Sequence, residues 1–230
     1  MTQSKSKAEL FTAMGIGPVW ELKNSPLAQA DSHSDSHIKP TSAQPSLESL
    51  RSTVASCRAC DLCETRKQTV FSDGVAQSHL MIVGEAPGAE EDETGMPFVG
   101  RAGQLLDRML NAVDRSRKSN VYIANVLKCR PPGNRDPHVG EIEKCSDHLF
   151  QQIALNNPKV LLLVGRFSIQ TLLNTKKSVG ELRGKVHHVT LNGLNIPAIV
   201  TYHPAYLLRR PEEKSKAWDD LLLLKKLGIQ

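Results

Sequence analysis

The sequence predicts an α/β protein in which helices cover both faces of a parallel sheet. Two observations carry this prediction. Short apolar runs of strand length recur along the chain, and apolar residues at helical spacing lie between and after them. Strands that alternate with helices in this way usually pair in parallel, with helices on both faces of the sheet.

The predicted elements follow in chain order. Apolar runs predict strands over residues 80–83, 121–126, 160–164 and 196–201. Helical spacing predicts helices over residues 105–113, 142–153 and 218–222. Ligands bind such sheets at the carboxyl ends of the strands, so the loops that follow the strands are the candidate functional site.

The composition is that of one soluble globular domain with some irregular sequence attached. The chain has 230 residues, of which 40% are hydrophobic and 23% are charged. No apolar run approaches the roughly 20 residues that a membrane helix needs, and the N-terminus lacks a hydrophobic signal core. We therefore expect a cytoplasmic protein with no membrane partner. We also expect it to act as a monomer.

The first fifth of the chain differs from the rest. Residues 8–23 have the pattern of one short amphipathic helix, and residues 24–46 have the Ser, His, Asp, Pro and Gln composition of a disordered linker. We expect an N-terminal extension over residues 1–45 and a folded domain over residues 46–230. The extension carries no motif that identifies a partner.

The net charge of +5 is unevenly distributed. Residues 81–100 hold five acids and no base, whereas residues 101–140 hold eight bases and three acids, and residues 181–230 hold eight bases and five acids. This balance permits a nucleic-acid partner, although basic stretches of this kind also occur as ordinary solvated surface.

The five cysteines predict a metal site rather than disulfides, because an odd number of thiols in a reducing compartment does not form a disulfide framework. Cys57, Cys60 and Cys63 form two overlapping C-x-x-C units, and 15 residues separate Cys129 from Cys145. Zinc sites usually pair two short units, whereas an iron–sulfur cluster accepts wider spacing. The spacing leaves iron–sulfur, zinc and simple buried thiols all open.

Polar or aromatic side chains follow three of the predicted strands. Phe98 lies in the Gly- and Pro-rich sequence after the first strand, Asn125 ends the second, and His203 follows the last. Each has an ordinary alternative role, namely core packing, turn formation and helix capping. Because the carboxyl ends of parallel strands meet at one edge, the three together predict a binding site there.

Seven motifs occur in order from about Ser56 to the end of the chain. They are Cys57-x-x-Cys60, Gly84-Glu85-Ala86-Pro87-Gly88, Pro97-Phe98-Val99-Gly100, Tyr122-Ile123-Ala124-Asn125, Lys128-Cys129-Arg130-Pro131-Pro132, Cys145 and His203-Pro204-Ala205-Tyr206-Leu207-Leu208. This combination resembles the family-four, iron–sulfur-containing uracil-DNA glycosylases of bacteria and archaea. The resemblance implies a three-layer α/β/α sandwich with a central four-stranded parallel sheet. It also implies a DNA repair enzyme that flips uracil out of DNA and hydrolyses its N-glycosidic bond, leaving an abasic site.

The resemblance also implies a cofactor. A [4Fe–4S] cluster would be held by Cys57, Cys60, Cys129 and Cys145, and Cys63 would be the spare thiol. Such a cluster would brace the loop between Cys129 and Cys145 near DNA. It need not carry electrons, because hydrolysis of a glycosidic bond is not a redox reaction.

For base recognition, the resemblance implies that Phe98 stacks on the flipped uracil and that Asn125 reads its O4 and N3–H groups. Glu91 would fill the space that the 5-methyl group of thymine needs. Ala86 and Gly88, in the first Gly/Pro loop, belong to the same uracil-binding set. Ala86 stands where better-known single-domain uracil glycosylases carry an aspartate, so that position supplies no carboxylate.

For catalysis, the resemblance implies that His203 donates a hydrogen bond to uracil O2. Glu85 would place the attacking water, with hydrogen bonding inside its own loop as the alternative. Asn134 is another candidate for holding the water or the loop.

DNA contacts would come from the two basic stretches. In the resemblance, Leu207 wedges into the duplex, and Arg209 and Arg210 contact phosphates. Arg130 and Arg135 place positive charge in the cysteine loop. An acidic base-reading loop would therefore lie beside basic loops that hold uracil-containing DNA.

Two other functions remain open from the sequence. The first is a uracil-DNA binder that becomes covalently trapped on its product, for which His138 is the residue to test, although the inserted basic loop of such proteins is missing. The second is a zinc-stapled DNA-binding adapter without catalysis. Metal analysis and a uracil-release assay distinguish these functions.

Overall fold

The computed structural model describes residues 45–227. The helix expected over residues 8–23 and nearly all of the expected linker lie outside the described residues. The first described helix, α2 (Leu47–Ala55), begins after Ser46, whose hydroxyl accepts a hydrogen bond from the Ser49 amide at 3.1 Å. This capping box starts the helix where the folded domain is expected to begin.

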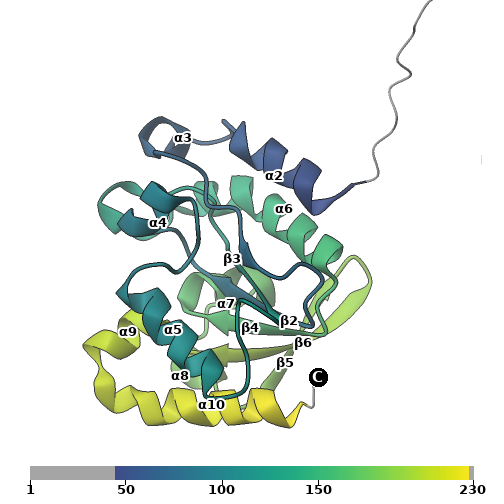
Figure 1. Ribbon diagram of the computed structural model, residues 1–230, viewed down its shortest axis with the longest axis vertical. Coiled ribbons are helices and arrows are strands. Elements are labelled where there is room, and N and C mark those ends of the chain that lie inside the picture. The colour runs from purple at the N-terminus through teal and green to yellow at the C-terminus, as the bar shows by residue number, and fades with distance from the viewer. Residues whose placement is uncertain (1–44, 228–230) are drawn as a thin grey trace, which may run out of the picture. The chain divides into compact units, whose positions relative to one another are not determined.

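Within the described residues, six strands form one sheet in the order β1-β3-β2-β4-β6-β5 (Figure 1). The strands are β1 (Asp73–Gly74), β2 (Leu80–Gly84), β3 (Val121–Asn125), β4 (Val160–Val164), β5 (Val186–Leu191) and β6 (Leu194–Thr201). The four central strands, β3, β2, β4 and β6, pair in parallel. They correspond to the four predicted strands, so the predicted parallel sheet is confirmed.

The two edge strands were not predicted, and both pair antiparallel with their neighbours. β5 joins β6 through Asn192 and Gly193, whose φ values of 50° and 79° suit a two-residue hairpin turn. The Asn-Gly pair was therefore a readable hairpin signal. β1 has only two residues and carries no strand pattern of its own.

Helices cover both faces of the sheet. The remaining helices are α3 (Leu62–Thr65), α4 (Ala89–Thr94), α5 (Arg101–Asn111), α6 (Val139–Asn156), α7 (Arg166–Leu173), α8 (Val179–Leu182), α9 (Pro204–Arg209) and α10 (Lys214–Lys226), with short 3-10 turns at η1 (Pro132–Asn134) and η2 (Pro211–Glu213). The three predicted helices are found as α5, α6 and α10. In residues 45–227, no helix is both long and apolar enough to span a bilayer.

Alternate residues of each strand enter opposite layers of the core. Met81 and Val83 of β2 pack with side chains of α6 and α7, whereas Leu80 and Ile82 pack with side chains of α5 and α10. This period of two, with helices on both sides, gives the three-layer α/β/α sandwich that was expected.

The strand register brings the predicted loops to one edge of the sheet. Gly84 at the end of β2 lies opposite Asn125 at the end of β3, and Val164 at the end of β4 lies opposite Thr201 at the end of β6. The segments that follow β2, β3 and β6 therefore meet at the carboxyl edge, where ligands bind in sheets of this kind.

Candidate active site

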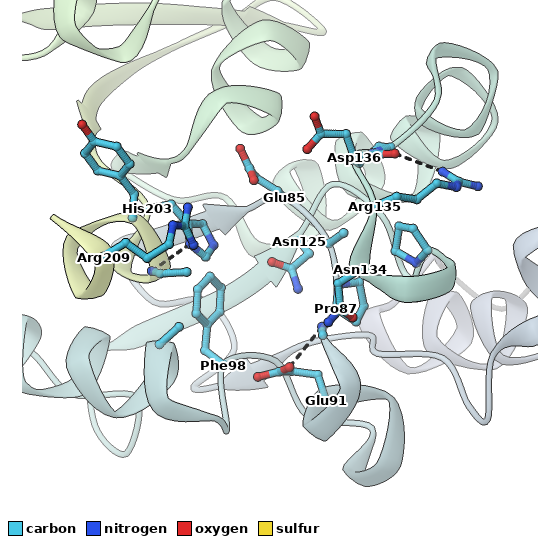
Figure 2. A pocket seen from close by; sticks show the side chains of 17 residues that line it. Glu85, Pro87, Glu91, Phe98, Asn125, Asn134, Arg135, Asp136, His203 and Arg209 are labelled. Atoms are coloured by element: carbon cyan, nitrogen blue, oxygen red, sulfur yellow. Dashed lines mark hydrogen bonds between the residues drawn. The ribbon is translucent and has the colours of Figure 1, made fainter.

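A cavity of about 390 Å³ opens at the carboxyl edge of the sheet (Figure 2). Ten of the residues singled out in the sequence line it: Glu85, Ala86, Gly88, Glu91, Phe98, Asn125, Asn134, Arg135, His203 and Arg209. Arg130, Leu207 and Arg210 are not among its lining residues. The structure thus brings together the residues expected to read a base and places part of the expected DNA-binding set outside the cavity.

Phe98 forms one wall of this cavity, in an unusual backbone conformation. Its φ angle is 55°, in the left-handed region, where a bulky residue is an outlier that costs of order 1–3 kcal/mol. Two glycines make room for it. A Cβ at Gly84 would lie 2.5 Å from Phe98 Cζ and 2.3 Å from Asn125 Oδ1, and a Cβ at Gly103 would lie 1.8 Å from the Phe98 carbonyl oxygen.

Asn125 is 2% exposed, and its Oδ1 atom has no hydrogen-bond partner among the described residues. An unpaired buried acceptor costs about 1–3 kcal/mol. Figure 2 shows the Asn125 amide beside Phe98 and His203, whose rings stack with their centroids 5.6 Å apart, on the side towards Asn134. The amide is therefore positioned to bind a polar ligand.

His203 is a neutral hydrogen-bond donor in this cavity. The pKa of His203 is lowered to about 4, chiefly by burial and then by the positive charge of Arg209, while Glu91 opposes the shift. The Ala205 amide donates to His203 Nδ1 at 3.1 Å, so the proton of the neutral ring resides on Nε2. The capping role that the sequence left open is real, because His203 is the N-cap of α9. This cap also fixes the tautomer.

Glu91 joins the two loops of the cavity wall. One carboxylate oxygen accepts from the Gly88 amide at 3.0 Å, and the other accepts from the Val99 and Gly100 amides at 2.9 and 3.2 Å. The side chain is thus held rigidly between the Gly/Pro loop and the Phe98 segment.

Glu85 lies on the opposite wall, against the start of α7. Its Oε1 atom accepts from the Phe167 amide at 3.0 Å, and burial raises the pKa of its carboxyl group. A Cβ at Gly165 would lie 2.6 Å from the same oxygen, so Gly165 permits this close approach. One carboxylate oxygen therefore serves the backbone at the start of α7, which is a different partner from the own-loop hydrogen bonds named as the alternative.

The polar residues of the segment between Cys129 and Cys145 (residues 130–144) largely bond to one another. Arg130 Nε donates to Asn134 Oδ1 at 2.7 Å, and Arg135 forms a two-pronged pair with Glu141 at 2.5 and 2.9 Å. This network stiffens the loop that leads from β3 into α6.

The five cysteines line a second, smaller cavity together. Cys129 and Cys145 are buried, with Cys60 packed against them. Arg66 Nη1 lies 3.0 Å from the Cys129 sulfur, and the Lys128 amide lies 3.3 Å from the Cys145 sulfur. Soft thiol ligands that receive N–H hydrogen bonds suit an iron–sulfur cluster, so the residues present fit such a cofactor.

The segment that leads to Cys129 also supports Asn125. Lys128 is 1% exposed, and its Nζ atom donates to the Asn125 carbonyl oxygen and to Gln152 Oε1, both at 2.5 Å. The Gln152 amide in turn donates to the Phe71 carbonyl oxygen at 3.0 Å. Residues 126–128 therefore connect Asn125 to Cys129 along the backbone, and the buried Lys128 side chain ties the same segment back to the Asn125 carbonyl oxygen.

Comparison with known proteins identifies the family. Residues 71–222 match the model of the uracil DNA glycosylase superfamily. The chain belongs to this superfamily. It is 41% identical over 187 residues to the type-4 uracil-DNA glycosylase of Archaeoglobus fulgidus, covering 80% of this chain and 92% of that protein. It is 39% identical over 181 residues to the type-4 uracil-DNA glycosylase of Pyrobaculum aerophilum, covering 77% and 92%.

Leu207 of this superfamily member does not lie as expected for a side chain that wedges into DNA. Leu207 is 1% exposed, whereas Leu208 is 36% exposed. Leu207 contributes to the groove between α5, α9 and α10 instead of projecting from the surface. The exposed leucine of the segment is thus the one that follows the motif position.

Several cavity residues of this superfamily member were not singled out from the sequence. They are Ala102, Asp136 and Pro137, whereas Pro87, Pro131, Ala205 and Tyr206 belong to the motifs but were given no role of their own. Asp136 is the one with charge, and its carboxylate accepts from Arg166 at 2.6 Å. Its place in the loop between Cys129 and Cys145 was the available signal, since that loop was already expected to approach DNA.

Proposed function

We propose that this protein is a type-4 uracil-DNA glycosylase, a DNA repair hydrolase that cleaves the N-glycosidic bond of a flipped uracil. One observation carries the proposal: the unpaired Asn125 Oδ1 atom lies in a cavity that also holds the Phe98 ring and the neutral His203 imidazole. The type-4 relatives support the same reaction class. Release of free uracil from DNA tests it.

Base recognition follows from this geometry. The enzyme extrudes the base at a cost of a few kcal/mol and stacks it on Phe98. Asn125 then accepts from uracil N3–H and donates to O4. Cytosine presents the opposite pattern at these two positions, so it would leave buried groups unpaired, and such sites reject the wrong partner strongly.

Discrimination against thymine falls to the wall that Glu91 builds. Its carboxylate holds the Gly88, Val99 and Gly100 amides, so neither loop can yield without breaking hydrogen bonds. Ala86 and Gly88 belong to the same wall. A 5-methyl group would have to displace this rigid assembly.

Cleavage transfers the bonding electron pair from C1′–N1 to uracil, and water supplies the hydroxyl group to C1′. The His203 Nε2–H group donates to uracil O2, where negative charge develops. Glu85 places the water with the carboxylate oxygen that does not bond to Phe167. Asn134 supports the loop through Arg130.

A [4Fe–4S] cluster would be held by Cys57, Cys60, Cys129 and Cys145, where it would brace the loop of residues 130–144 without electron transfer. Cys63 contacts Glu64 at 3.4 Å instead. In residues 45–227, no three His, Cys, Asp or Glu side chains converge on a single ion position.

The cofactor assignment predicts a brown protein with broad visible absorption and about four iron atoms per chain. Replacement of Cys145 by alanine should remove most of the iron and lower the melting temperature, because the buried ligand is lost. The matched control, Cys63→Ala, should keep its iron. Metal analysis that finds one zinc per wild-type chain would overturn the assignment.

DNA binding is assigned to the surface around the cavity. Arg209 lines the cavity mouth, and Arg210 is exposed, with Glu212 at 3.6 Å. Arg130 and Arg135 add positive charge from the cysteine loop. Because Leu207 is buried, we propose Leu208 as the side chain that fills the space left by the flipped base.

The two leucines should therefore behave differently when each is replaced by alanine. Leu208→Ala should slow uracil excision from duplex DNA roughly tenfold and affect single-stranded DNA less, because only the duplex must be held open. Leu207→Ala should instead cost about 2–5 kcal/mol of stability. Single-turnover rates on both substrates and thermal unfolding measure these effects. Unchanged duplex excision in Leu208→Ala would remove the wedge assignment.

Two remaining expectations are consistent with this function. One is that the protein acts as a monomer, and the other is that it works on DNA in the cytoplasm. The covalent-trapping alternative receives less support, because His138 does not belong to the cavity lining. An SDS-resistant adduct with uracil-DNA would revive that alternative.

A further inference from the structure

The left-handed backbone of Phe98 needs a restraint that the catalytic residues do not provide. Its φ of 55° is an unfavourable conformation for a phenylalanine. Such conformations persist only where the surroundings impose them, and they occur preferentially at functional sites. The direction of the Phe98 ring, and with it the base platform, depends on this conformation.

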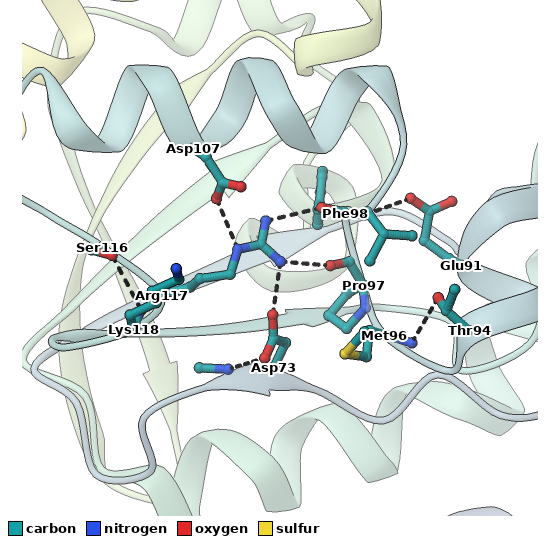
Figure 3. A network of polar contacts seen from close by, with 12 residues as sticks. Asp73, Glu91, Thr94, Met96, Pro97, Phe98, Asp107, Ser116, Arg117 and Lys118 are labelled. Carbon is teal, nitrogen blue, oxygen red and sulfur yellow. Dashed lines mark hydrogen bonds and ion pairs between the residues drawn. The ribbon is translucent and has the colours of Figure 1, made fainter.

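Arg117 provides that restraint (Figure 3). Its Nη1 atom donates to the Pro97 carbonyl oxygen at 3.0 Å, and its Nη2 atom donates to the Phe98 carbonyl oxygen at 2.9 Å. The Arg117 side chain is 14% exposed. Two consecutive carbonyl groups are thus held by one planar cation on the side away from the cavity.

Two carboxylates orient this guanidinium group. Asp73 of the edge strand β1 accepts from Nη1 at 2.8 Å, and Asp107 of α5 accepts from Nε at 2.8 Å. Both acids neutralise the charge of Arg117 where it is mostly buried. The short strand β1 and the helix α5 therefore both position the platform.

Arg117 and Glu91 bind different backbone groups of the same segment. Arg117 binds the carbonyl groups of Pro97 and Phe98, whereas Glu91 binds the amide groups of Val99 and Gly100. A guanidinium group can serve four acceptors at fixed angles, and a lysine ammonium group cannot reproduce that fork.

We propose that Arg117 is a positioning residue for base recognition, which acts through Phe98 by fixing the ring before uracil arrives. This inference rests on the proposed function. It concerns the preorganisation of the platform, because Arg117 is not among the residues that line the cavity.

The experiment compares Arg117→Lys with the wild type in two assays: single-turnover uracil excision and inhibition by free uracil. We expect the excision rate to fall roughly tenfold and the inhibition constant of uracil to rise by a similar factor. The matched control is Arg183→Lys, since Arg183 is 16% exposed and also pairs with an aspartate, Asp220, but makes no hydrogen bond to the Phe98 segment. The control should leave the uracil inhibition constant within twofold of wild type.

A double-mutant cycle separates positioning from general stability. In a Phe98→Gly background, where no ring remains and the left-handed backbone is unstrained, Arg117→Lys should change excision less than twofold. A full tenfold effect in that background, or an unchanged uracil inhibition constant in the single variant, would overturn the inference.

The remaining outcomes are also decisive. If Arg117→Lys does not fold, Asp107→Asn weakens the same restraint more gently, and its uracil inhibition constant should rise two- to fourfold; an unchanged constant would overturn the inference. If the wild type releases no uracil, both the proposed function and this inference fail. If the wild type is active and Arg117→Lys matches it, the positioning role alone fails.

Discussion

Replacement of His203 by alanine should lower uracil excision by about 10²–10³-fold, the usual cost of losing one donor to a developing anion. DNA affinity should change little, because the imidazole is directed at the base rather than at the phosphates. Single-turnover kinetics with excess enzyme measure the first effect, and anisotropy with uncleavable DNA measures the second. His188→Ala, at an exposed histidine of β5, is the matched control.

The low pKa of His203 gives this prediction a pH dependence. A pKa of about 4 means that the ring is neutral at pH 6–8, so the ratio of wild-type to His203→Ala rates should be constant there. The neutral form of the ring, with Nδ1 as the acceptor for the Ala205 amide, is lost only as the pH falls through about 4. Equal wild-type and variant rates at neutral pH would contradict the assigned role, as would a ratio that titrates near pH 6.5.

Replacement of Asn125 by aspartate should reduce uracil excision by about 10²-fold or more. The carboxylate has no donor for uracil O4 and places negative charge against that oxygen, so a buried contact becomes repulsive. The preference for uracil over cytosine should also fall, because the carboxylate can accept from the cytosine amino group. Base release from matched uracil and cytosine oligonucleotides measures both effects.

The control for Asn125→Asp is the same substitution at Asn192, an exposed residue of the β5–β6 turn. Aspartate tolerates the left-handed conformation of that turn, so folding and excision should both be retained. Wild-type excision by Asn125→Asp would mean that the amide does not read the base.

The central sheet and the cavity residues were predictable because their signals are local. Apolar runs at strand length gave the four parallel strands, and the residues that follow β2, β3 and β6 meet at one edge, where Phe98, Asn125 and His203 line one cavity. Helical spacing in the same way located α5, α6 and α10.

Other features depend on contacts between distant segments, which sequence patterns do not encode. The two-residue strand β1 exists because Asp73 pairs with Ile123 of β3, and Arg117 acquires its role only when Asp73, Asp107 and the Phe98 segment surround it. Likewise, the motif alone could not tell that Leu207 packs inward while Leu208 is exposed.

Free-base release from a panel of otherwise identical oligonucleotides that carry uracil, thymine, cytosine or hypoxanthine decides whether this cavity selects uracil. The iron-loaded wild-type protein should release uracil and leave an alkali-labile abasic site, with cytosine and thymine retained. Binding to uracil-DNA without any released base, or equal release of thymine and uracil, would contradict a cavity in which Asn125 and the Glu91 wall select uracil.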